Sequence, residues 1–330
     1  MNTRVAVIGA GSWGTTVASL ISPKNDVTLW ARRQALADEI NKRCTNERYL
    51  AGFALDPSLH ATSEMAEAVH SAELIIMAVP SHGFRDVMTM VSNCLTTNAA
   101  LVSLTKGLER DSLLRMSEVM REVCPGRPTG ILTGPNLAKE VMAGQPAAAV
   151  VAMDDSDACA LVQQVAMTDT FRVYTGDDVI GAEIAGVVKN VMAIAAGMAD
   201  GMGFGDNTKA TLVTRGLAEM ARLGVALGGK PATFAGLAGM GDLVATCSST
   251  QSRNHMVGIE LGRGRHIDDV VGAMQMVAEG VKSAPVVLEL ARRHHVDVPL
   301  SQQVVEVVQG RATAAQAVHS LMTRSAKSES

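Results

Sequence analysis

The segment that most constrains the fold lies at the N-terminus. Residues 4–8 (Arg-Val-Ala-Val-Ile) form a short apolar stretch typical of a buried strand, and Gly9-Ala-Gly-Ser-Trp-Gly14 follows it directly. A helix is predicted after this turn, from Thr15 to Ile21. A glycine-x-glycine-x-x-glycine turn between a strand and a helix is typical of a doubly wound α/β sheet that binds a dinucleotide.

Each glycine of this turn has a physical role in that reading. Gly9 permits a tight turn, Gly11 lets the backbone approach a pyrophosphate, and Gly14 lets the helix pack on the strand. The first helical N–H groups then face the anion. The competing interpretation is a glycine turn in an unrelated α/β protein.

Strand and helix signals continue to alternate along the first half of the chain. Strands are predicted over 26–31, 73–79, 99–104 and 129–132, with helices from Gly83, Ser112 and Leu137, and two further strands over 147–152 and 171–175 with a helix between them. Alternation of this kind predicts a parallel sheet that is covered on both faces, with ligands at the carboxyl ends of the strands. Lys106 follows one of these strands, so it is expected to face the cofactor crevice.

Strand signals cease after about residue 178. Helices are predicted from Ala182, over 207–227, 252–261, 268–276, 283–293 and 300–308. We therefore expect an N-terminal Rossmann-like dinucleotide-binding domain over 1–180 and an all-helical substrate and catalytic domain over 181–330.

Lys189 lies in the middle of the most apolar of these helices, residues 181–197. A helix that is apolar on nearly every face is surrounded by protein, and a buried ammonium needs a partner or a function. One interpretation is that Lys189 extends to water or pairs with a structural carboxylate. The other is that it takes part in catalysis.

Arg32 and Arg33 stand where an NAD-specific site usually places an acidic residue after its second strand. A guanidinium at this place can bind a 2′-phosphate, which favours NADPH, or the use of both NAD and NADP. Alternatively, the two arginines simply begin the next helix on a solvated face.

Two polar segments of the helical half are candidate site elements. Asp242 ends the glycine-rich segment 236–241, where tight turns are expected, and it is either a helix N-cap or a carboxylate that pairs with Lys189. Arg253 follows Ser252 in the first turn of a predicted helix, where the helix dipole disfavours a cation unless an anion binds there. The alternative for Arg253 is a solvated side chain.

Composition excludes several classes of partner and site. A formal net charge of -4 without a basic cluster argues against nucleic acid as a partner. Five scattered cysteines predict free thiols in a reducing cytoplasm, and the histidines lack the spacing of a metal site. We also expect no secretory leader and no membrane span, since the first strand begins at Arg4 and no long apolar run lacks a charge.

Taken together, the motifs resemble those of the bacterial NAD(P)-dependent glycerol-3-phosphate dehydrogenase family, from Val5 to about Ala317. The segments that carry the resemblance, in chain order, are Gly9–Gly14, Val79–His82, Thr105–Leu108, Gly134–Glu140, Val188–Val191, Gly241–Leu243 and Gln251–Asn254.

The resemblance implies a reaction and a set of roles. Lys189 would exchange the proton on the C2 oxygen as glycerol 3-phosphate and dihydroxyacetone phosphate interconvert, with Lys106 and Asp242 as the other catalytic residues. It places the substrate contacts on Lys106, Gly134, Asn136, Lys189, Asp242, Ser252, Arg253 and Asn254. It places the dinucleotide contacts, in addition to the glycines, on Ser12, Trp13, Arg32, Lys106, Ala138, Arg253, Val277 and Glu279. Many family members carry serine or threonine where Asn136 stands; an amide can also donate to a substrate oxygen.

The resemblance also implies a homodimer that supplies glycerol 3-phosphate for phospholipid synthesis. Two other functions remain open from the residues. One is a β-hydroxyacid or 6-phosphogluconate type of dehydrogenase, although there the lysine and asparagine are usually three apart, whereas Lys189 and Asn190 are adjacent. The other is a non-catalytic sensor of the dinucleotide redox ratio, which would not need the two lysines and a phosphate-binding arginine.

Overall fold

The computed structural model describes residues 2–272 and 278–325. The chain forms two compact units, Met1–Glu183 and Ile184–Ser330, so the observed division falls three residues after the predicted one at 180. The boundary between the two units lies inside one long helix, α9 (Val179–Gly201).

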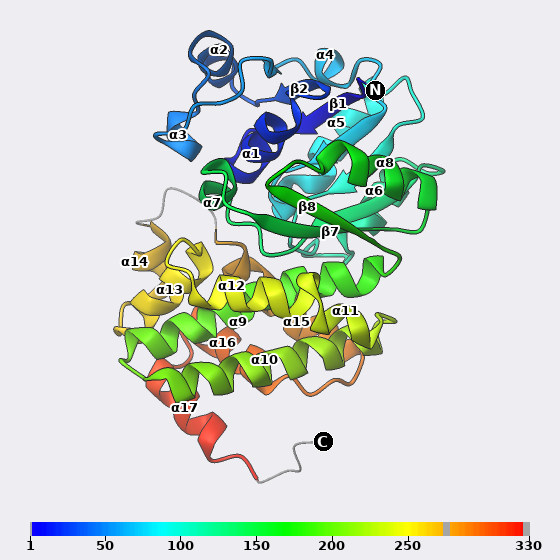
Figure 1. Ribbon diagram of the computed structural model, residues 1–330. Helices are drawn as coiled ribbons and strands as arrows, with labels where there is room; N and C mark the ends of the chain where they lie inside the picture. Colours follow the sequence, from blue (N-terminus) through cyan, green and yellow to red (C-terminus); the bar gives the residue numbers. More distant parts are fainter. Residues whose placement is uncertain (1, 273–277, 326–330) are drawn as a thin grey trace. The chain divides into compact units, whose positions relative to one another are not determined.

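The first unit is built on one eight-stranded sheet with the order β3-β2-β1-β4-β5-β6-β7-β8 (Figure 1). The chain runs outward from β1 to β3 on one side and then returns to place β4 on the other side of β1. This reversal makes β1 and β4 the switch point at which doubly wound sheets bind their ligands. The strands are β1 (Arg4–Ile8), β2 (Asp26–Trp30), β3 (His60–Thr62), β4 (Leu74–Met77), β5 (Ala100–Ser103), β6 (Thr129–Thr133), β7 (Ala147–Met153) and β8 (Phe171–Gly176).

The sheet is mostly parallel, as predicted, and departs from that arrangement at one place. β6 and β7 pair antiparallel, whereas all other neighbouring strands are parallel. A parallel crossover needs a connection long enough to run back along the strand. The only helix between β6 and β7 is α7 (Ala138–Met142), whose five residues are too few for that return, so β7 turns back beside β6.

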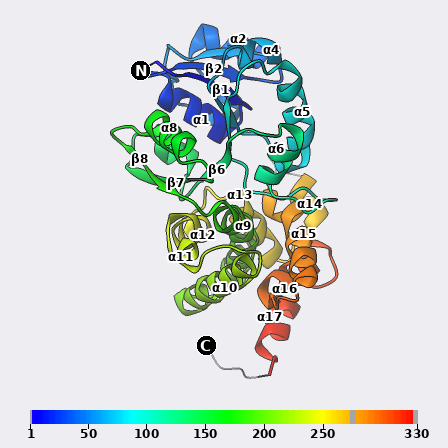
Figure 2. The same ribbon diagram turned by 90° about the vertical axis from the view of Figure 1, so that its right-hand side faces the viewer.

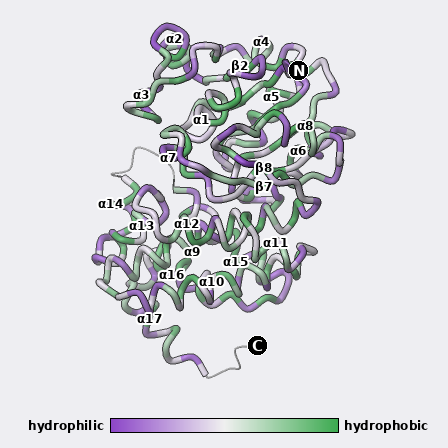
Figure 3. The backbone as a smooth tube through the Cα atoms, viewed as in Figure 1, coloured by the Kyte–Doolittle hydropathy of each residue, from purple (hydrophilic) through white to green (hydrophobic). Residues whose placement is uncertain are grey.

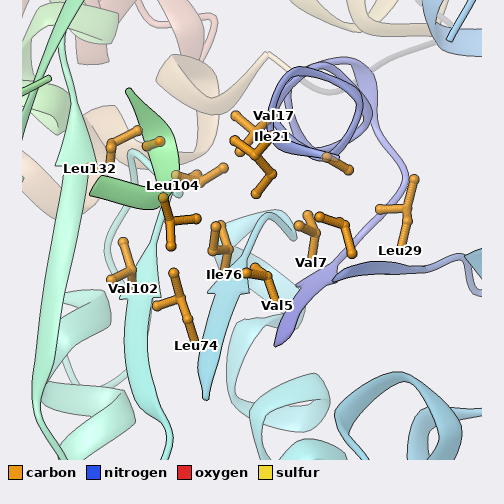
Figure 4. Packing of buried hydrophobic residues seen from close by; sticks show 14 of the residues in the cluster. Val5, Val7, Val17, Ile21, Leu29, Leu74, Ile76, Val102, Leu104 and Leu132 are labelled. Atoms are coloured by element: carbon orange, nitrogen blue, oxygen red, sulfur yellow. The ribbon is translucent and has the colours of Figure 1, made fainter. Parts of the chain in front are cut away.

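Both faces of the sheet are buried, as the apolar strands predict. In β1, Val5 and Val7 point to one face, where α1, α2 and α8 contribute to the core; Ala6 and Ile8 point to the other, which α4, α5 and α6 cover. Figure 4 shows the first of these layers, with Val17 and Ile21 of α1 above strand residues. The helices of this unit are α1 (Ser12–Ile21), α2 (Gln34–Arg43), α3 (Glu47–Leu50), α4 (Met65–Val69), the 3₁₀ turn η1 (Ser81–Gly83), α5 (Phe84–Cys94), α6 (Met116–Val123), α7 and α8 (Ser156–Ala166).

Two helix starts in this unit differ from prediction. α1 begins at Ser12 rather than Thr15, because Gly11 already serves as its N-cap. The helix predicted from Ser112 begins only at Met116, since residues 109–114 form a small loop. The Glu109 N–H donates to the Leu114 carbonyl oxygen and the Leu113 N–H donates to the Glu109 carbonyl oxygen, which closes the loop.

The second unit is helical, as predicted (Figure 2). Its helices, after α9, are α10 (Asp206–Ala226), α11 (Pro231–Ala235), the π-helical turn η2 (Leu237–Gly241), α12 (Asp242–Ser248), α13 (Arg253–Gly262), α14 (Ile267–Gly272), α15 (Glu279–Arg293), α16 (Pro299–Val308) and α17 (Ala314–Met322). The sequence pattern did not predict α11, α12 or α17. The helix predicted over 268–276 is described only to Gly272, because its remaining residues lie outside the described part of the chain.

Tight turns were expected over 236–241, and the structure has a π-helical turn there instead. The physical reason is packing against α11, because a Cβ on Gly239 would lie 2.1 Å from the carbonyl oxygen of Phe234. The two backbone segments lie so close that only a glycine fits at this position. This is the close backbone approach that the glycine-rich sequence predicts.

Residues 181–199 of α9 are all buried, which confirms that this helix is surrounded by protein. By length and composition α9 could cross a membrane, but 94% of its most apolar window is buried inside the protein, as in the core helix of a soluble protein. Figure 3 shows the contrast between the apolar α9 and the hydrophilic α2.

Glu183 fixes the first turns of α9 to α6. Its carboxylate accepts hydrogen bonds from the Ser117 backbone N–H at 2.8 Å and hydroxyl at 2.6 Å, and it lies 2.8 Å from the Arg115 guanidinium. Burial raises the pKa of Glu183, and the Arg115 charge and the Ser117 donors oppose that shift. The α6 N-terminus therefore holds the first turn of α9 within the first unit.

α9 and α13 touch through their backbones. Glycines four residues apart on each helix make this possible: a Cβ on Gly258 would lie 2.2 Å from the Ile194 carbonyl oxygen, and one on Gly201 would lie 2.2 Å from that of Ile259. Gly197 and Gly262 have similarly close neighbours across the same contact. Because only hydrogen atoms fit between the helices, their separation is fixed by the main chain.

We predict that Gly258→Ala destabilises the protein. Alanine gains about 1 kcal/mol over glycine in a helix, but overpacking against a backbone carbonyl costs about 1–3 kcal/mol or more, because the two helices must separate. Thermal unfolding should therefore show a lower Tm for this variant. The matched control is Gly272→Ala in α14, where a Cβ would meet nothing within 4 Å and the Tm should stay or rise. Equal Tm values for Gly258→Ala and the wild type would contradict the close packing.

Candidate functional site

In the glycine turn after β1, neighbouring atoms pack closely against Gly9 and Gly14, whereas the space beside Gly11 is open. Gly9 has a φ of +120°, and a Cβ on it would lie 2.6 Å from the Ala78 carbonyl oxygen. A Cβ on Gly14 would lie 2.0 Å from the Gly9 carbonyl oxygen, so α1 packs directly on the turn. At Gly11 a Cβ would meet nothing within 4 Å, which leaves the backbone open to a ligand.

This open turn fits a dinucleotide pyrophosphate. Gly11 is the N-cap of α1 and supplies no side-chain acceptor to the first-turn N–H groups. The turn lies after β1 at the switch point of the sheet. Backbone donors and the positive end of the helix dipole therefore suit an anion here.

Ser12 and Trp13 begin α1. The Ser12 hydroxyl donates to the Tyr49 carbonyl oxygen at 2.8 Å, and the Trp13 ring packs against Phe171 with centroids 6.1 Å apart. The Trp13 Nε1–H is buried without a hydrogen-bond partner among the described residues. An unpaired buried donor costs folding free energy unless a ligand accepts its hydrogen bond.

Asn46 was not predicted as part of the site, yet it supports the glycine turn. Its side chain is fully buried and donates to the Ala10 carbonyl oxygen at 3.1 Å and to the Thr15 hydroxyl at 2.9 Å. Its Oδ1 accepts from the Tyr49 N–H, so Asn46 is also the N-cap of α3. An asparagine before a short helix was a visible cap signal, but its contact 36 residues back along the chain was not.

Arg32 and Arg33 follow the end of β2, and both are exposed. Neither forms an ion pair within the described part of the chain, and Arg33, the N-cap of α2, makes no side-chain cap hydrogen bond. Their guanidinium groups are therefore available to a phosphate. Exposed guanidinium groups in this position are what binding of a 2′-phosphate requires.

Lys106 and Gly134 come together at the carboxyl ends of β5 and β6. The Lys106 ammonium donates to the Gly134 carbonyl oxygen at 2.9 Å, and Gly134 has a φ of +141°. Nearby in sequence, both amide atoms of Asn136 and the hydroxyl of Thr133 are buried without a partner among the described residues. Ala138 begins α7 two residues further on. The unpaired amide of Asn136 is consistent with its predicted contact to a ligand.

Lys189 and Asp242 form a buried ion pair in the second unit. The Lys189 Nζ lies 3.0 Å from Asp242 Oδ1, and the two side chains are 9% and 2% exposed. Nζ also donates to the Thr246 hydroxyl at 2.7 Å, and that hydroxyl in turn lies 2.6 Å from the Asp242 carbonyl oxygen. Two of the three ammonium hydrogens are thereby used, and the third has no hydrogen-bond partner among the described residues.

Of the two interpretations of Asp242, the structure supports pairing with Lys189 and not N-capping. Asp242 lies in the first turn of α12, but the N-cap is Gly241 and no side-chain cap hydrogen bond forms. Thr246 was missed, because the helix that places it one turn after Asp242 was not predicted. Burial raises the pKa of the adjacent Cys247 thiol to about 12 although Lys189 opposes the shift, so this thiol stays neutral.

Arg253 lies in the first turn of α13, as predicted. Ser252 is the N-cap, and its hydroxyl accepts from the His255 N–H at 3.3 Å. Removal of water around the Arg253 guanidinium lowers its pKa, and the Glu279 charge opposes that shift. Arg253 as a whole is exposed. A bound anion would nevertheless stabilise its guanidinium, because it would offset both the desolvation of the positive charge and the unfavourable helix dipole.

Asn254 is tied to two other helices. Its amide nitrogen donates to Asn190 Oδ1 at 2.9 Å, and its amide oxygen accepts from the Gly280 N–H at 2.9 Å. One hydrogen of the amide nitrogen remains, so the predicted substrate contact of Asn254 stays a prediction. Of the two predicted dinucleotide contacts next to this region, Glu279 begins α15, and Val277 lies outside the described residues.

Comparison with known proteins places these residues in a family. The family models described as the N-terminus and the C-terminus of NAD-dependent glycerol-3-phosphate dehydrogenase match residues 4–159 and 178–319. The chain is 51% identical over 329 residues to the NAD(P)+-dependent glycerol-3-phosphate dehydrogenase 2 of Sphingopyxis alaskensis, covering 100% of this chain and 99% of that one. It is 49% identical over 329 residues to the NAD(P)+-dependent glycerol-3-phosphate dehydrogenase of Streptomyces coelicolor, covering 99% and 98% of the two chains.

A solved structure agrees with these relatives. The glycerol-3-phosphate dehydrogenase of Coxiella burnetii superposes with a TM-score of 0.93 at 36% identity, covering 98% of this chain and 99% of that chain. Both family models, the relatives and the solved structure span nearly the whole chain and point to one assignment. With its open glycine turn and its buried lysine–aspartate pair, the chain belongs to the NAD-dependent glycerol-3-phosphate dehydrogenase family.

Proposed function

We propose that the protein interconverts sn-glycerol 3-phosphate and dihydroxyacetone phosphate, with NAD(H) or NADP(H) as the cofactor. The observation that carries this proposal is the buried Lys189 ammonium, which Asp242 and Thr246 orient while one of its hydrogens remains available. The bound nicotinamide supplies the chemistry that the side chains lack, a hydride exchanged with substrate C2. Family membership supports the same substrate pair.

In this proposal Lys189 moves the proton. During reduction of dihydroxyacetone phosphate the C2 carbonyl oxygen gains negative charge, and the Lys189 ammonium donates a proton to it; during oxidation the amine takes that proton back. Asp242 holds the Nζ in place, and Thr246 fixes the direction of the remaining N–H. Lys106 would add a second positive charge to the same oxygen.

The other predicted residues bind and orient. The Gly9–Gly14 turn, with Ser12, Trp13 and Ala138, would hold the dinucleotide, and Gly134 and Asn136 would contact the substrate. Ser252, Arg253 and Asn254 would hold the substrate phosphate at the N-terminus of α13, so that C2 stays in one position.

The direct test mixes the purified protein with NADPH and dihydroxyacetone phosphate and follows absorbance of the reduced nicotinamide. We expect loss of absorbance that requires the phosphorylated ketone. No turnover with either NADPH or NADH would overturn the proposed function.

We predict that Lys189→Ala and Lys189→Arg each lower kcat at least about a hundredfold, while the affinity for cofactor is kept. Arginine keeps the positive charge beside Asp242 but cannot release a proton near neutral pH, so it separates proton transfer from charge stabilisation. Steady-state kinetics and cofactor titration by fluorescence measure both quantities. Near-normal kcat in Lys189→Arg would remove the proton-transfer role.

Arg32 and Arg33 support the preference for NADPH. We predict that replacing both by alanine raises KM for NADPH about tenfold or more and changes KM for NADH little, since only NADPH carries the 2′-phosphate. Arg43→Ala, at the exposed other end of α2, is the control and should change neither. A wild type that strongly prefers NADH would contradict this assignment.

We further propose that the protein is a homodimer that works in the cytoplasm and provides glycerol 3-phosphate for phospholipid synthesis. This part of the proposal rests on the family alone. Sedimentation velocity at micromolar concentration should give the mass of two chains, and a species of 34.5 kDa would refute the dimer.

A further inference from the structure

His255 is a buried residue that the reaction does not use. It is the third residue of α13, directly after Arg253 and Asn254, and it is 2% exposed. A buried imidazole next to a proposed phosphate-binding turn needs an explanation, because burying its polar atoms is costly unless each has a partner.

Its contacts close the turn that precedes α13. The ring Nδ1 lies 3.1 Å from the carbonyl oxygen of Ser249, and the backbone N–H of Ser252 donates to that same oxygen at 3.1 Å. The backbone N–H of His255 in turn donates to the Ser252 hydroxyl at 3.3 Å. The side chain and the backbone N–H of His255 therefore both form hydrogen bonds with the turn of residues 249–252.

The other ring nitrogen connects this turn to α9. Nε2 lies 2.9 Å from Asp200 Oδ2, and the Lys209 ammonium lies 3.4 Å from the other oxygen of that carboxylate. Both ring nitrogens thus face acceptor oxygens, one a main-chain carbonyl and one a carboxylate. The Ser249 carbonyl oxygen can only accept, so the contact with Nδ1 is a hydrogen bond in which the ring nitrogen donates.

The backbone around His255 leaves little freedom for the ring to move as a whole. A Cβ on Gly197 would lie 2.1 Å from the His255 carbonyl oxygen, so the main chain of α13 is pressed against α9 at this residue. With the backbone fixed on one side and Asp200 fixing Nε2, the direction of the Nδ1–H toward Ser249 is determined.

We infer that His255 is a positioning residue for the substrate phosphate. It does not touch the substrate; it holds the Ser249–Ser252 turn, so that Ser252 and Arg253 keep the geometry that binds a phosphate at the N-terminus of α13. This inference rests on the proposed function, in which the phosphate binds there. It further implies that α9 orients both parts of the second unit's site, through Lys189 and, eleven residues later, through Asp200.

The test uses two substitutions that each keep one nitrogen contact. An asparagine amide nitrogen takes the place of Nδ1, so His255→Asn keeps the bond to Ser249, whereas a glutamine amide nitrogen takes the place of Nε2, so His255→Gln keeps only the contact with Asp200. We expect His255→Gln to raise KM for dihydroxyacetone phosphate about tenfold, the effect of one lost hydrogen bond, with kcat nearly unchanged. His255→Asn should stay within about threefold of the wild type.

A phosphate-free substrate separates positioning from general damage. With dihydroxyacetone, which lacks the phosphate, kcat/KM should be the same in the wild type, His255→Gln and His255→Asn. Inhibition by inorganic phosphate gives an independent binding readout, and its inhibition constant should rise in His255→Gln in parallel with KM. An unchanged KM in His255→Gln, or equal losses with both substrates, would overturn the inference.

A second variant keeps the inference testable if His255→Gln does not fold. Asp200→Asn retains an oxygen acceptor that can still fix Nε2 and leaves the Ser249 contact intact, so KM for dihydroxyacetone phosphate should stay within about threefold. A tenfold rise would show that the negative charge of Asp200, and not the position of the ring against Ser249, sets KM, and the inference would fail. The wild type separates the two levels of proposal. If it does not reduce dihydroxyacetone phosphate at all, the proposed function fails, whereas wild-type turnover with unaffected variants rejects only the role of His255.

Discussion

The ion pair between Lys189 and Asp242 determines much of the second unit. Taking two charges out of water costs several kcal/mol per ion, and only close pairing with further hydrogen bonds offsets that cost. Here the offset comes from a 3.0 Å contact and from the Thr246 hydroxyl, which bonds the ammonium and the α12 backbone together. Since loss of one partner would leave an unpaired buried charge, α9 and α12 are held to one mutual arrangement. A catalytic role for the Lys189 ammonium explains why a buried charge with this desolvation cost is present in α9.

The features predicted from sequence are those that local physics decides. The strand at Arg4–Ile8 has the predicted bounds, because five apolar-rich residues before a glycine turn leave few alternatives. Lys189 was found because an ammonium in the middle of a helix that is apolar on nearly every face contradicts its surroundings, whatever the rest of the fold is. Both signals can be read within about twenty residues, and the structure supports both. Arg253 belongs with them, since a cation in a helix's first turn is likewise a local contradiction.

What could not be predicted depends on contacts between distant segments. Asn46 supports the glycine turn through a carbonyl oxygen 36 residues away, and no periodicity announces that pair. Thr246 was hidden behind the π-helical turn that precedes α12, where Gly239 packs directly against the backbone of Phe234. The direction of β7 follows from the shortness of α7, a length that the apolar pattern did not define.

The glycine contact between α9 and α13 explains why such distant polar groups can still be accurate. Where side chains separate two helices, the spacing follows from rotamers and can adjust by repacking. Gly201 and Gly258 bring carbonyl oxygens against the facing backbone instead, so the spacing is set by bonded geometry and cannot adjust in small steps. The first turn of α13, with Ser252 and Arg253, is therefore held relative to α9 by main chain. The His255 imidazole, which contacts the Ser249 carbonyl oxygen and Asp200, adds polar contacts between the turn before α13 and α9.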